Sequence, residues 1–285
     1  MEIPDDLEAE RLLRNNTPID DFLGMTPSEV HALLYDTFGD KSPIQFNPGI
    51  DDGILDQIPL FRIAEAYLKI VQRDKQIKLT PLGALPKKVM VEIYAHRFLP
   101  DEAIEYGIVK LTREHDCISI QNARLALELA GLAKKVHGKI TLTKAGEKLL
   151  QTNNRVQIFK KFFQAFTDKF DWGFNDAYPE EPIGQFGWAF TMILLDMFGD
   201  QPRTADFYAE RYLRAFPNLL SFSRPSYTLT TAGVFTRCFA VRTFSRFLVW
   251  FGFAIIDKEG RITDLSRGQI TGTDLVKKVF KIDVG

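Results

Sequence analysis

The sequence predicts a mainly α (α+β) fold in which tandem winged-helix-like units are joined by a helical middle region. Two observations carry this prediction. Apolar residues recur at helical spacing over much of the chain, and a short pattern containing Leu-Thr and a later glycine occurs more than once beside β-compatible segments. Aromatic residues make up 12% of the 285 residues, so the chain has enough large side chains to fill substantial cores.

The repeated pattern appears most completely at two places. Residues 77–83 and 140–146 both read I-x-L-T-x-x-G at an offset of 63, and residues 229–233 keep the L-T-x-x-G part. A second similarity relates residues 131–141 to residues 252–263, where G-[LF]-A is followed by G-[KR]-I-T. These similarities predict related structural units.

The clearest unit is expected at about 100–150. A helix at 118–130 has its apolar residues on one face and ends at Gly131, which favours a left-handed C-terminal cap. Two short strands at 132–136 and 139–142 follow, with His137-Gly138 as the turn between them. Thr143 is placed to cap a helix at 144–150. This order of helix, two-stranded wing and helix is typical of a winged helix.

Two further units are expected. The C-terminal unit has a long helix at 232–250, strands at 253–257 and 261–263, and a last helix at 273–280. A degenerate unit at 59–97 has a helix and the strand at 77–80 but lacks a clear hairpin.

The predicted organisation therefore has four parts. They are an acidic N-terminal segment with short helices at 1–58, the degenerate and clear units at 59–152, a helical aromatic-rich region at 153–228 and the C-terminal unit at 229–285. Thr26 to Glu29 forms a capping-box pattern in the first part. The aromatic stripe of the predicted helix at 156–170 is interpreted as core, with a dimer surface as the alternative.

Composition favours a cytoplasmic protein that does not enter a membrane. Cys117 and Cys238 are the only cysteines and are far apart, which does not suggest a disulfide framework. The N-terminus lacks a signal-peptide pattern. The longest apolar run, 247–256, is too short to span a bilayer. Charge is uneven, because residues 1–60 carry a net −10 while the whole chain carries −1.

The sequence contains no pattern that predicts catalysis. It lacks a G-x-S-x-G elbow and the glycine-rich loops that bind phosphate. His115-Asp116-Cys117 places three ligand types side by side but without the spacing of a zinc site. We therefore expect a non-enzymatic protein with no metal and no cofactor. An enzyme whose site is assembled from residues distant in sequence is a further alternative.

A basic stretch is the main functional signal. Residues 134–161 carry eight basic side chains and one acidic side chain, Glu147. The leading hypothesis is binding of duplex DNA, with the wing lysines on the backbone and the polar face of helix 118–130 near the bases. The residues assigned to backbone contact are Lys134, Lys135, Lys139 and Lys144, and those assigned to the bases are Asn122 and Arg124.

Alternatives to this hypothesis are also open. The basic stretch is also interpreted as an ordinary solvated helix face. Arg242 and Arg246, with Arg237, are interpreted equally as phosphate contacts or as partners of the acidic N-terminal segment. The second hypothesis for the whole protein is a protein–protein interaction scaffold that does not bind nucleic acid.

The sequence resembles a family of uncharacterised bacterial proteins with winged-helix-like repeats. The resemblance is carried by residues 25–35 (MTPSEVHALLY), 79–86 (LTPLGALP) and 130–146. Some members of that family carry a SEC-C zinc motif. The cysteine and histidine cluster of that motif is absent from this sequence, so the resemblance implies no zinc site here. It implies architecture and no particular activity.

Overall fold

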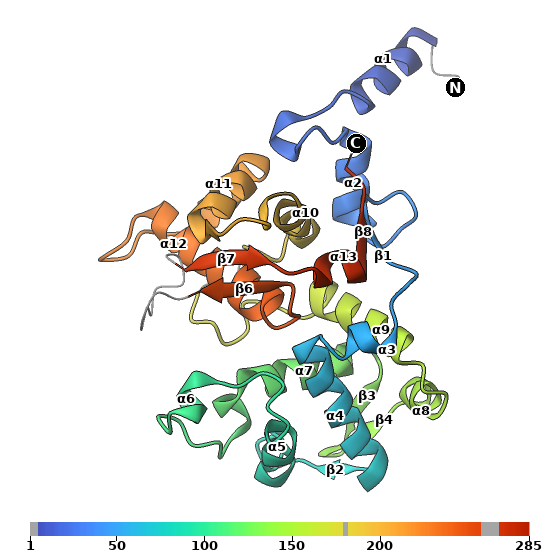
Figure 1. Ribbon diagram of the computed structural model, residues 1–285, viewed down its shortest axis with the longest axis vertical. Helices are drawn as coiled ribbons and strands as arrows, with labels where there is room; N and C mark the ends of the chain where they lie inside the picture. The colour runs from blue at the N-terminus through green and yellow to red at the C-terminus, as the bar shows by residue number, and fades with distance from the viewer. Residues whose placement is uncertain (1–4, 179–181, 258–267, 285) are drawn as a thin grey trace. The chain divides into compact units, whose positions relative to one another are not determined.

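The computed structural model describes residues 5–178, 182–257 and 268–284 (Figure 1). The chain divides into two compact units. The central unit comprises residues 50–175 with 250–252, and the terminal unit comprises residues 1–49, 176–249 and 253–285. Helices predominate over short antiparallel strands in both units, which confirms the predicted mainly α (α+β) class.

The central unit is built from helices around one short sheet. Its elements in chain order are α3 (Asp52–Leu55), α4 (Pro59–Asp74), β2 (Ile77–Lys78), α5 (Lys87–Tyr94), α6 (Glu102–Glu105), η2 (Glu114–Asp116), α7 (Ile118–Leu129), β3 (Ala133–Val136), β4 (Lys139–Leu142), α8 (Lys144–Gln151) and α9 (Arg155–Asp168). Figure 1 shows α4, α5 and α7 gathered beside the strands.

The sheet of the central unit has the order β2-β4-β3, and all its pairs are antiparallel. Ile77 of β2 pairs with Ile140 of β4, so the two copies of the I-x-L-T pattern are neighbours in one sheet. The degenerate unit predicted at 59–97 and the clear unit predicted at 100–150 thus share a single sheet and do not form two. The β3–β4 hairpin turns at His137 and Gly138, which both have positive φ as a two-residue type I′ turn requires.

The core of the central unit is strongly aromatic. Phe159, Phe162, Phe163 and Phe166 of α9 are at most 2% exposed, and α9 packs against α7 and α8. The ring of Phe251 lies 5.0 Å from that of Phe163 and 5.1 Å from that of Phe166. The predicted aromatic stripe is therefore core, as the simpler interpretation held.

The terminal unit contains the remaining elements. They are α1 (Asp5–Asn15), η1 (Asp20–Phe22), α2 (Pro27–Tyr35), β1 (Ile44–Phe46), α10 (Trp188–Phe198), β5 (Arg203–Thr204), α11 (Ala205–Ala215), η3 (Pro217–Phe222), α12 (Thr231–Phe239), the π-helix η4 (Ala240–Leu248), β6 (Ala254–Asp257), β7 (Gln269–Gly272), α13 (Leu275–Val279) and β8 (Phe280–Ile282). The predicted capping box at Thr26 and Glu29 is present at the start of α2. Strands β1 and β8, from near the two ends of the chain, pair antiparallel.

Both units repeat one connectivity. Apart from the short helices α6, η2 and η3, the order in the central unit is α4, β2, α5, α7, β3, β4. In the terminal unit it is α10, β5, α11, α12 with η4, β6, β7. The terminal sheet has the order β5-β7-β6, which corresponds to β2-β4-β3. The C-terminal unit predicted at 229–285 thus recruits α10, β5 and α11 from the region predicted as a helical link. The strand predicted at 261–263 lies outside the described residues, and the strand that pairs with β6 is β7.

Within the described part of the chain, no helix combines the length and the apolar character needed to cross a bilayer.

Candidate functional site

The outer face of the central sheet carries an unusual concentration of lysines. Lys78 of β2 lies directly opposite Lys139 of β4, and Lys134 of β3 follows on the same face by the alternation of the pleat. Ile77 and Ile140 point to the other face and are at most 3% exposed. Like charges directly opposite one another destabilise a strand pair. The Lys78–Lys139 pair therefore has an electrostatic cost that a bound anion would offset.

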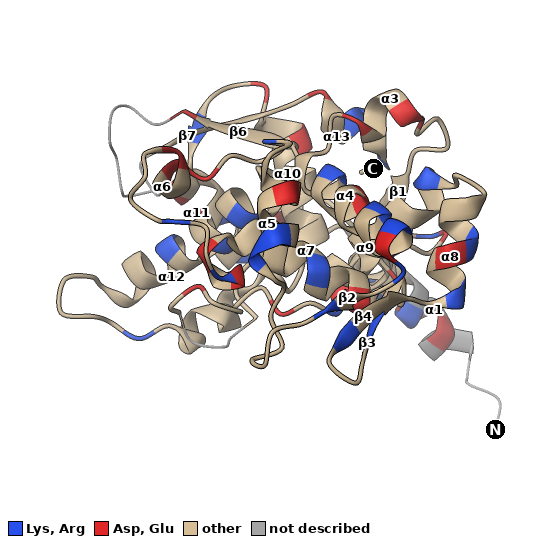
Figure 2. Cartoon of the chain, turned by 90° about the horizontal axis from the view of Figure 1, so that it is seen from below, with Lys and Arg blue, Asp and Glu red and all other residues tan. Residues whose placement is uncertain are grey.

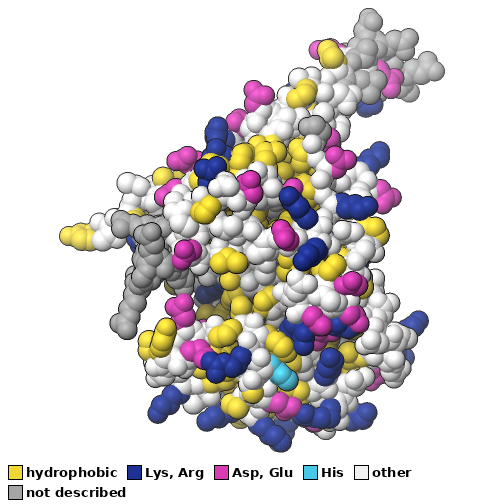
Figure 3. Space-filling view, viewed as in Figure 1, with side chains coloured by type: hydrophobic (Ala, Val, Ile, Leu, Met, Phe, Trp, Pro, Cys, Tyr) yellow, Lys and Arg dark blue, Asp and Glu magenta, His cyan; other side chains and the backbone are white. Residues whose placement is uncertain are grey.

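The surroundings of this face contain few acids. Residues 75–91 and 129–146 together hold eight lysines and no aspartate or glutamate, and the β2–β4 pairing brings the two segments together. Lys75, Lys87 and Lys88 are exposed like Lys78. Figure 2 shows basic positions along the strands of this sheet, and Figure 3 shows basic side chains gathered where Figure 1 places β2. We call Lys78, Lys134 and Lys139 the sheet lysines.

The other two predicted backbone contacts, Lys135 and Lys144, do not lie on the outer face of the sheet. Lys135 is exposed and alternates to the opposite face of β3, where its amine reaches the turn at Gly83. Lys144 is exposed in the first turn of α8. A cation near a helix N-terminus is electrostatically unfavourable, so Lys144 does not stabilise its helix through the dipole.

The terminal unit supplies an internal comparison for the sheet lysines. In its sheet, Ile255 pairs with Thr271 as Lys134 pairs with Thr141, and Thr204 pairs with Gln269 as Lys78 pairs with Lys139. The same connectivity is thus built with Ile, Thr and Gln in place of the three lysines. The fold itself does not require a basic face at these positions.

The two side chains predicted to approach bases are buried. Asn122 is 2% exposed and Arg124 is 6% exposed. The expectation that helix 118–130 presents this polar face to solvent is wrong, because α4, α5 and α9 all contact α7. The sequence pattern showed one apolar face, and the polar face is covered by elements whose packing the pattern does not reveal.

Arg124 has its charge satisfied inside the protein. Its guanidinium is hydrogen-bonded to Glu114, which is 1% exposed, and to Glu128 of α7, with an Nη1–Oε1 distance of 2.6 Å. Glu114 also accepts the backbone N–H of Leu85 at 2.9 Å. Burial alone lowers the pKa of Arg124, but the hydrogen bonds and charges of Glu114 and Glu128 outweigh it and raise the pKa. Through these hydrogen bonds, Arg124 of α7 and Leu85, which precedes α5, are both bound to Glu114.

The arginines predicted on the C-terminal helix are also not free surface cations. Arg242 is 1% exposed and pairs with Asp176, which is buried as well. Arg246 is half-buried, and burial lowers its pKa. Arg242 and Arg246 belong to the terminal unit, whereas the wing lysines belong to the central unit.

No group of three or more His, Cys, Asp or Glu side chains converges to hold a metal ion in the part of the chain that the structure describes. At His115-Asp116-Cys117, the His115 Nε2 lies 3.6 Å from Asp116, while Cys117 is buried and burial raises the pKa of its thiol. Asp116 instead accepts the backbone N–H groups of Thr112 and Arg113. These residues shape the turn before α7.

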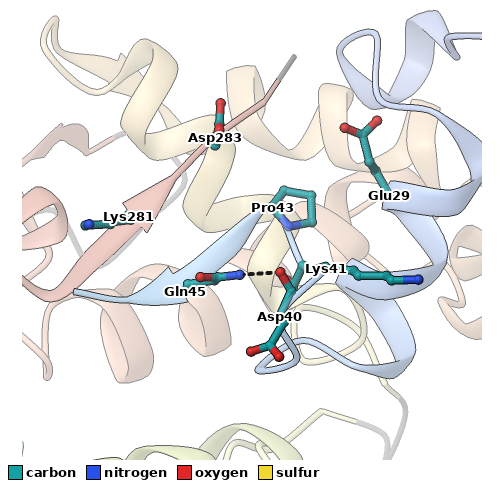
Figure 4. A pocket seen from close by; sticks show the side chains of 8 residues that line it. Glu29, Asp40, Lys41, Pro43, Gln45, Lys281 and Asp283 are labelled. Atoms are coloured by element: carbon teal, nitrogen blue, oxygen red, sulfur yellow. Dashed lines mark hydrogen bonds between the residues drawn. The ribbon is translucent and has the colours of Figure 1, made fainter. Parts of the chain in front are cut away.

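One cavity in the terminal unit has a volume of about 400 Å³ beside the β1–β8 pair (Figure 4). Its charged side chains include Glu29, Asp40, Lys41, Lys281 and Asp283. Figure 4 shows Lys41 and Lys281 pointing in opposite directions, and Glu29 is engaged in the capping box. Because the charges are mixed and do not converge, we assign no chemistry to this cavity.

Lys78 is the residue that sequence reasoning missed. The I-x-L-T repeat was interpreted as two separate strands in two units, which left Lys78 outside the basic stretch. The signal for it was present, because two acid-free, lysine-rich segments each contain one copy of the repeat. Pairing the copies antiparallel would have placed Lys78 opposite Lys139.

Comparison with known proteins identifies one family model. Residues 56–155 match the Y4jL N-terminal domain. This range runs from just before α4 to the first residue of α9 and so covers the helices and the sheet of the central unit. Neither the search of curated proteins nor the search of solved structures finds a match.

Proposed function

We propose that the central unit is a winged helix that binds the phosphate backbone of nucleic acid through the outer face of its sheet. The connectivity supports the first part of this proposal, because a helix, a strand, two helices and a two-stranded wing form a sheet in which the first strand pairs with the last. The sheet lysines support the second part. The observation that carries it is the Lys78–Lys139 pair, two like charges held opposite each other, with Lys78 exposed and Lys139 half-buried.

The proposed binding of phosphates by the sheet differs from the binding of bases by a recognition helix. In helix-turn-helix proteins the second helix of the motif lies in the major groove. The corresponding helix here is α7, which is covered by α4, α5 and α9 and has its Arg124 bound to two glutamates. Contacts from lysines to phosphates position a protein on nucleic acid without reading its sequence. We therefore expect binding with little dependence on sequence.

The test is a fluorescence-anisotropy titration with duplex DNA of random sequence at several salt concentrations. Each phosphate contact contributes about 0.9 to the slope of log affinity against log salt. Replacing the three sheet lysines (K78A, K134A and K139A together) is expected to lower that slope by up to about 2.7. The matched control replaces three exposed lysines away from the sheet (K41A, K110A and K169A), which changes the net charge equally.

An equal loss in the two triple variants would show that only net charge matters and would overturn the assignment to the sheet. No binding of the unmodified protein at low salt would overturn the nucleic-acid proposal and favour a protein partner.

A further inference from the structure

A groove on the central unit lies between α4 and the C-terminal end of α5. Its volume is about 400 Å³, which falls within the range of pockets that hold small organic ligands. Arg62, Lys69 and Arg73 line it from α4, at spacings of seven and four residues that place them along one side of the helix. Glu92, His96 and Phe98 line it from the other side.

At one end of the groove, Arg62 and His96 both lie against the ring of Phe98. The guanidinium carbon of Arg62 lies 4.7 Å from the ring centroid of Phe98. The imidazole of His96 is nearly parallel to Phe98, with the ring centroids 5.0 Å apart and an interplanar angle of 6°. His96 is exposed, and no other ring among the described residues stacks on it. His96 therefore offers an exposed imidazole on which a further planar group can stack.

The middle of the groove holds an exposed cation, Lys69. Its charge interacts with Asp56, which is hydrogen-bonded to Arg62 and Arg155. The neighbours of Lys69 are already engaged, since Arg73 pairs with Asp74 and Glu92, and Arg62 pairs with Asp56. The carboxylate of Glu65, which also lines the groove, is bound by Arg155 at 2.6 and 2.7 Å. Lys69 is thus the side chain best placed to attract an anion into the groove.

The residues that line the groove from α4 are close in sequence to Lys78, one of the sheet lysines. Arg62 to Arg73 spans roughly 16 Å of α4 at about 1.5 Å per residue, and α4 ends at Asp74, four residues before Lys78. Lys75 lies between them and is exposed. The groove and the sheet lysines therefore belong to the same compact unit.

We propose that this groove holds one unpaired nucleotide, with its base stacked on His96 and its phosphate at Lys69. The inference rests on the proposed function and adds the ligand class, namely nucleic acid with a single-stranded segment. A base within a duplex is already stacked on both faces, so only an unpaired base is free to stack on the exposed imidazole of His96. Each base stacked on an aromatic side chain contributes substantially and with little sequence preference.

The experiment compares three labelled DNA probes: a single strand, the corresponding blunt duplex and the duplex with an unpaired overhang. The unmodified protein is expected to bind the two probes with unpaired nucleotides more tightly than the blunt duplex. H96A is expected to weaken binding of those two probes roughly five-fold or more and to leave blunt-duplex binding unchanged. K69A is expected to lower the salt slope for the probes with unpaired nucleotides only. The control is H115A, which removes an exposed histidine outside the groove, and thermal melts show that each variant is folded.

Three outcomes are distinguishable. Loss of the preference in folded H96A but not in H115A supports the inference. Equal affinity for all three probes, or an H96A effect as large on the blunt duplex, overturns it while leaving backbone binding by the sheet intact. No binding of any probe overturns the proposed function as well.

Discussion

Glu114 joins α7 to the segment before α5. It is 1% exposed, binds the guanidinium of Arg124 and accepts the backbone N–H of Leu85. Removing one partner of a buried ion pair leaves an uncompensated charge, so E114A is expected to lower the free energy of unfolding by about 3–5 kcal/mol. Replacing Glu114 and Arg124 together with leucine is expected to cost less, because the one charge left without its partner, Glu128, is partly exposed to solvent. Urea denaturation of the two variants measures this difference, and equal losses would contradict the network's role.

Asp116 makes the free energy of unfolding of the protein depend on pH. Burial raises the pKa of Asp116, but the backbone N–H groups of Arg113 and Thr112 and the Thr112 hydroxyl outweigh burial and lower it. A lowered pKa stabilises the fold above the ordinary carboxyl pKa of about 3.9, and this contribution is lost as the pH falls through the folded-state value. D116N is therefore expected to be about 1–3 kcal/mol less stable at neutral pH, with the difference from the unmodified protein shrinking below about pH 4. Chemical denaturation across pH measures it, and a difference that does not change with pH would exclude this explanation.

At the scale of elements, the repeated L-T-x-x-G pattern is largely a helix-start signal. Thr143 and Thr230 are both N-caps whose hydroxyl accepts the N–H of the glycine three residues later. In the first copy, Thr80 and Gly83 instead form a tight turn between β2 and α5. Sequence reasoning predicted the cap at Thr143 correctly because capping is local. It did not predict that Ile77 pairs with Ile140, because strand pairing is set by packing between distant segments.

Gly146 and Gly233, whose N–H groups donate to the capping threonines, are expected to differ in how much alanine changes the stability. A Cβ on Gly146 would lie 2.2 Å from the carbonyl oxygen of Leu132, whereas a Cβ on Gly233 would meet its neighbours at 3.4 Å or more. G146A must displace the backbone of the wing, and we expect a loss of stability of about 2 kcal/mol or more, as is typical of overpacking. G233A is expected to be neutral or stabilising by up to about 1 kcal/mol through helix propensity. Thermal unfolding of the pair measures the contrast, and similar shifts would show that the close approach at Gly146 relaxes without cost.

At the scale of the whole molecule, two copies of one connectivity carry different surfaces. The buried positions of both sheets are apolar, as Ile140 and Ile270 illustrate, because every sheet must pack one face. The outer positions diverge, with lysines in one unit and Ile, Thr and Gln in the other. The periodicity of the sequence therefore predicted helices and the wing hairpin. It did not predict that the C-terminal unit includes β5, because Thr204 of β5 pairs with Gln269 of β7, 65 residues later in the chain.

The division of the chain into units predicts where a core mutation acts. Phe251 lies late in the sequence but belongs to the central unit, where it is fully buried against Phe162, Phe163 and Phe166 of α9. Truncating a buried phenylalanine to alanine typically costs about 3–5 kcal/mol, so F251A is expected to destabilise the central unit by that amount. Hydrogen exchange is expected to show faster exchange in α4 and α9 than in α10 and α11, while F222A, which truncates a ring 39% exposed, changes little. Exchange that increases equally in all four helices would show that the two units unfold as one, because the loss of a single ring would then have spread beyond the core it fills.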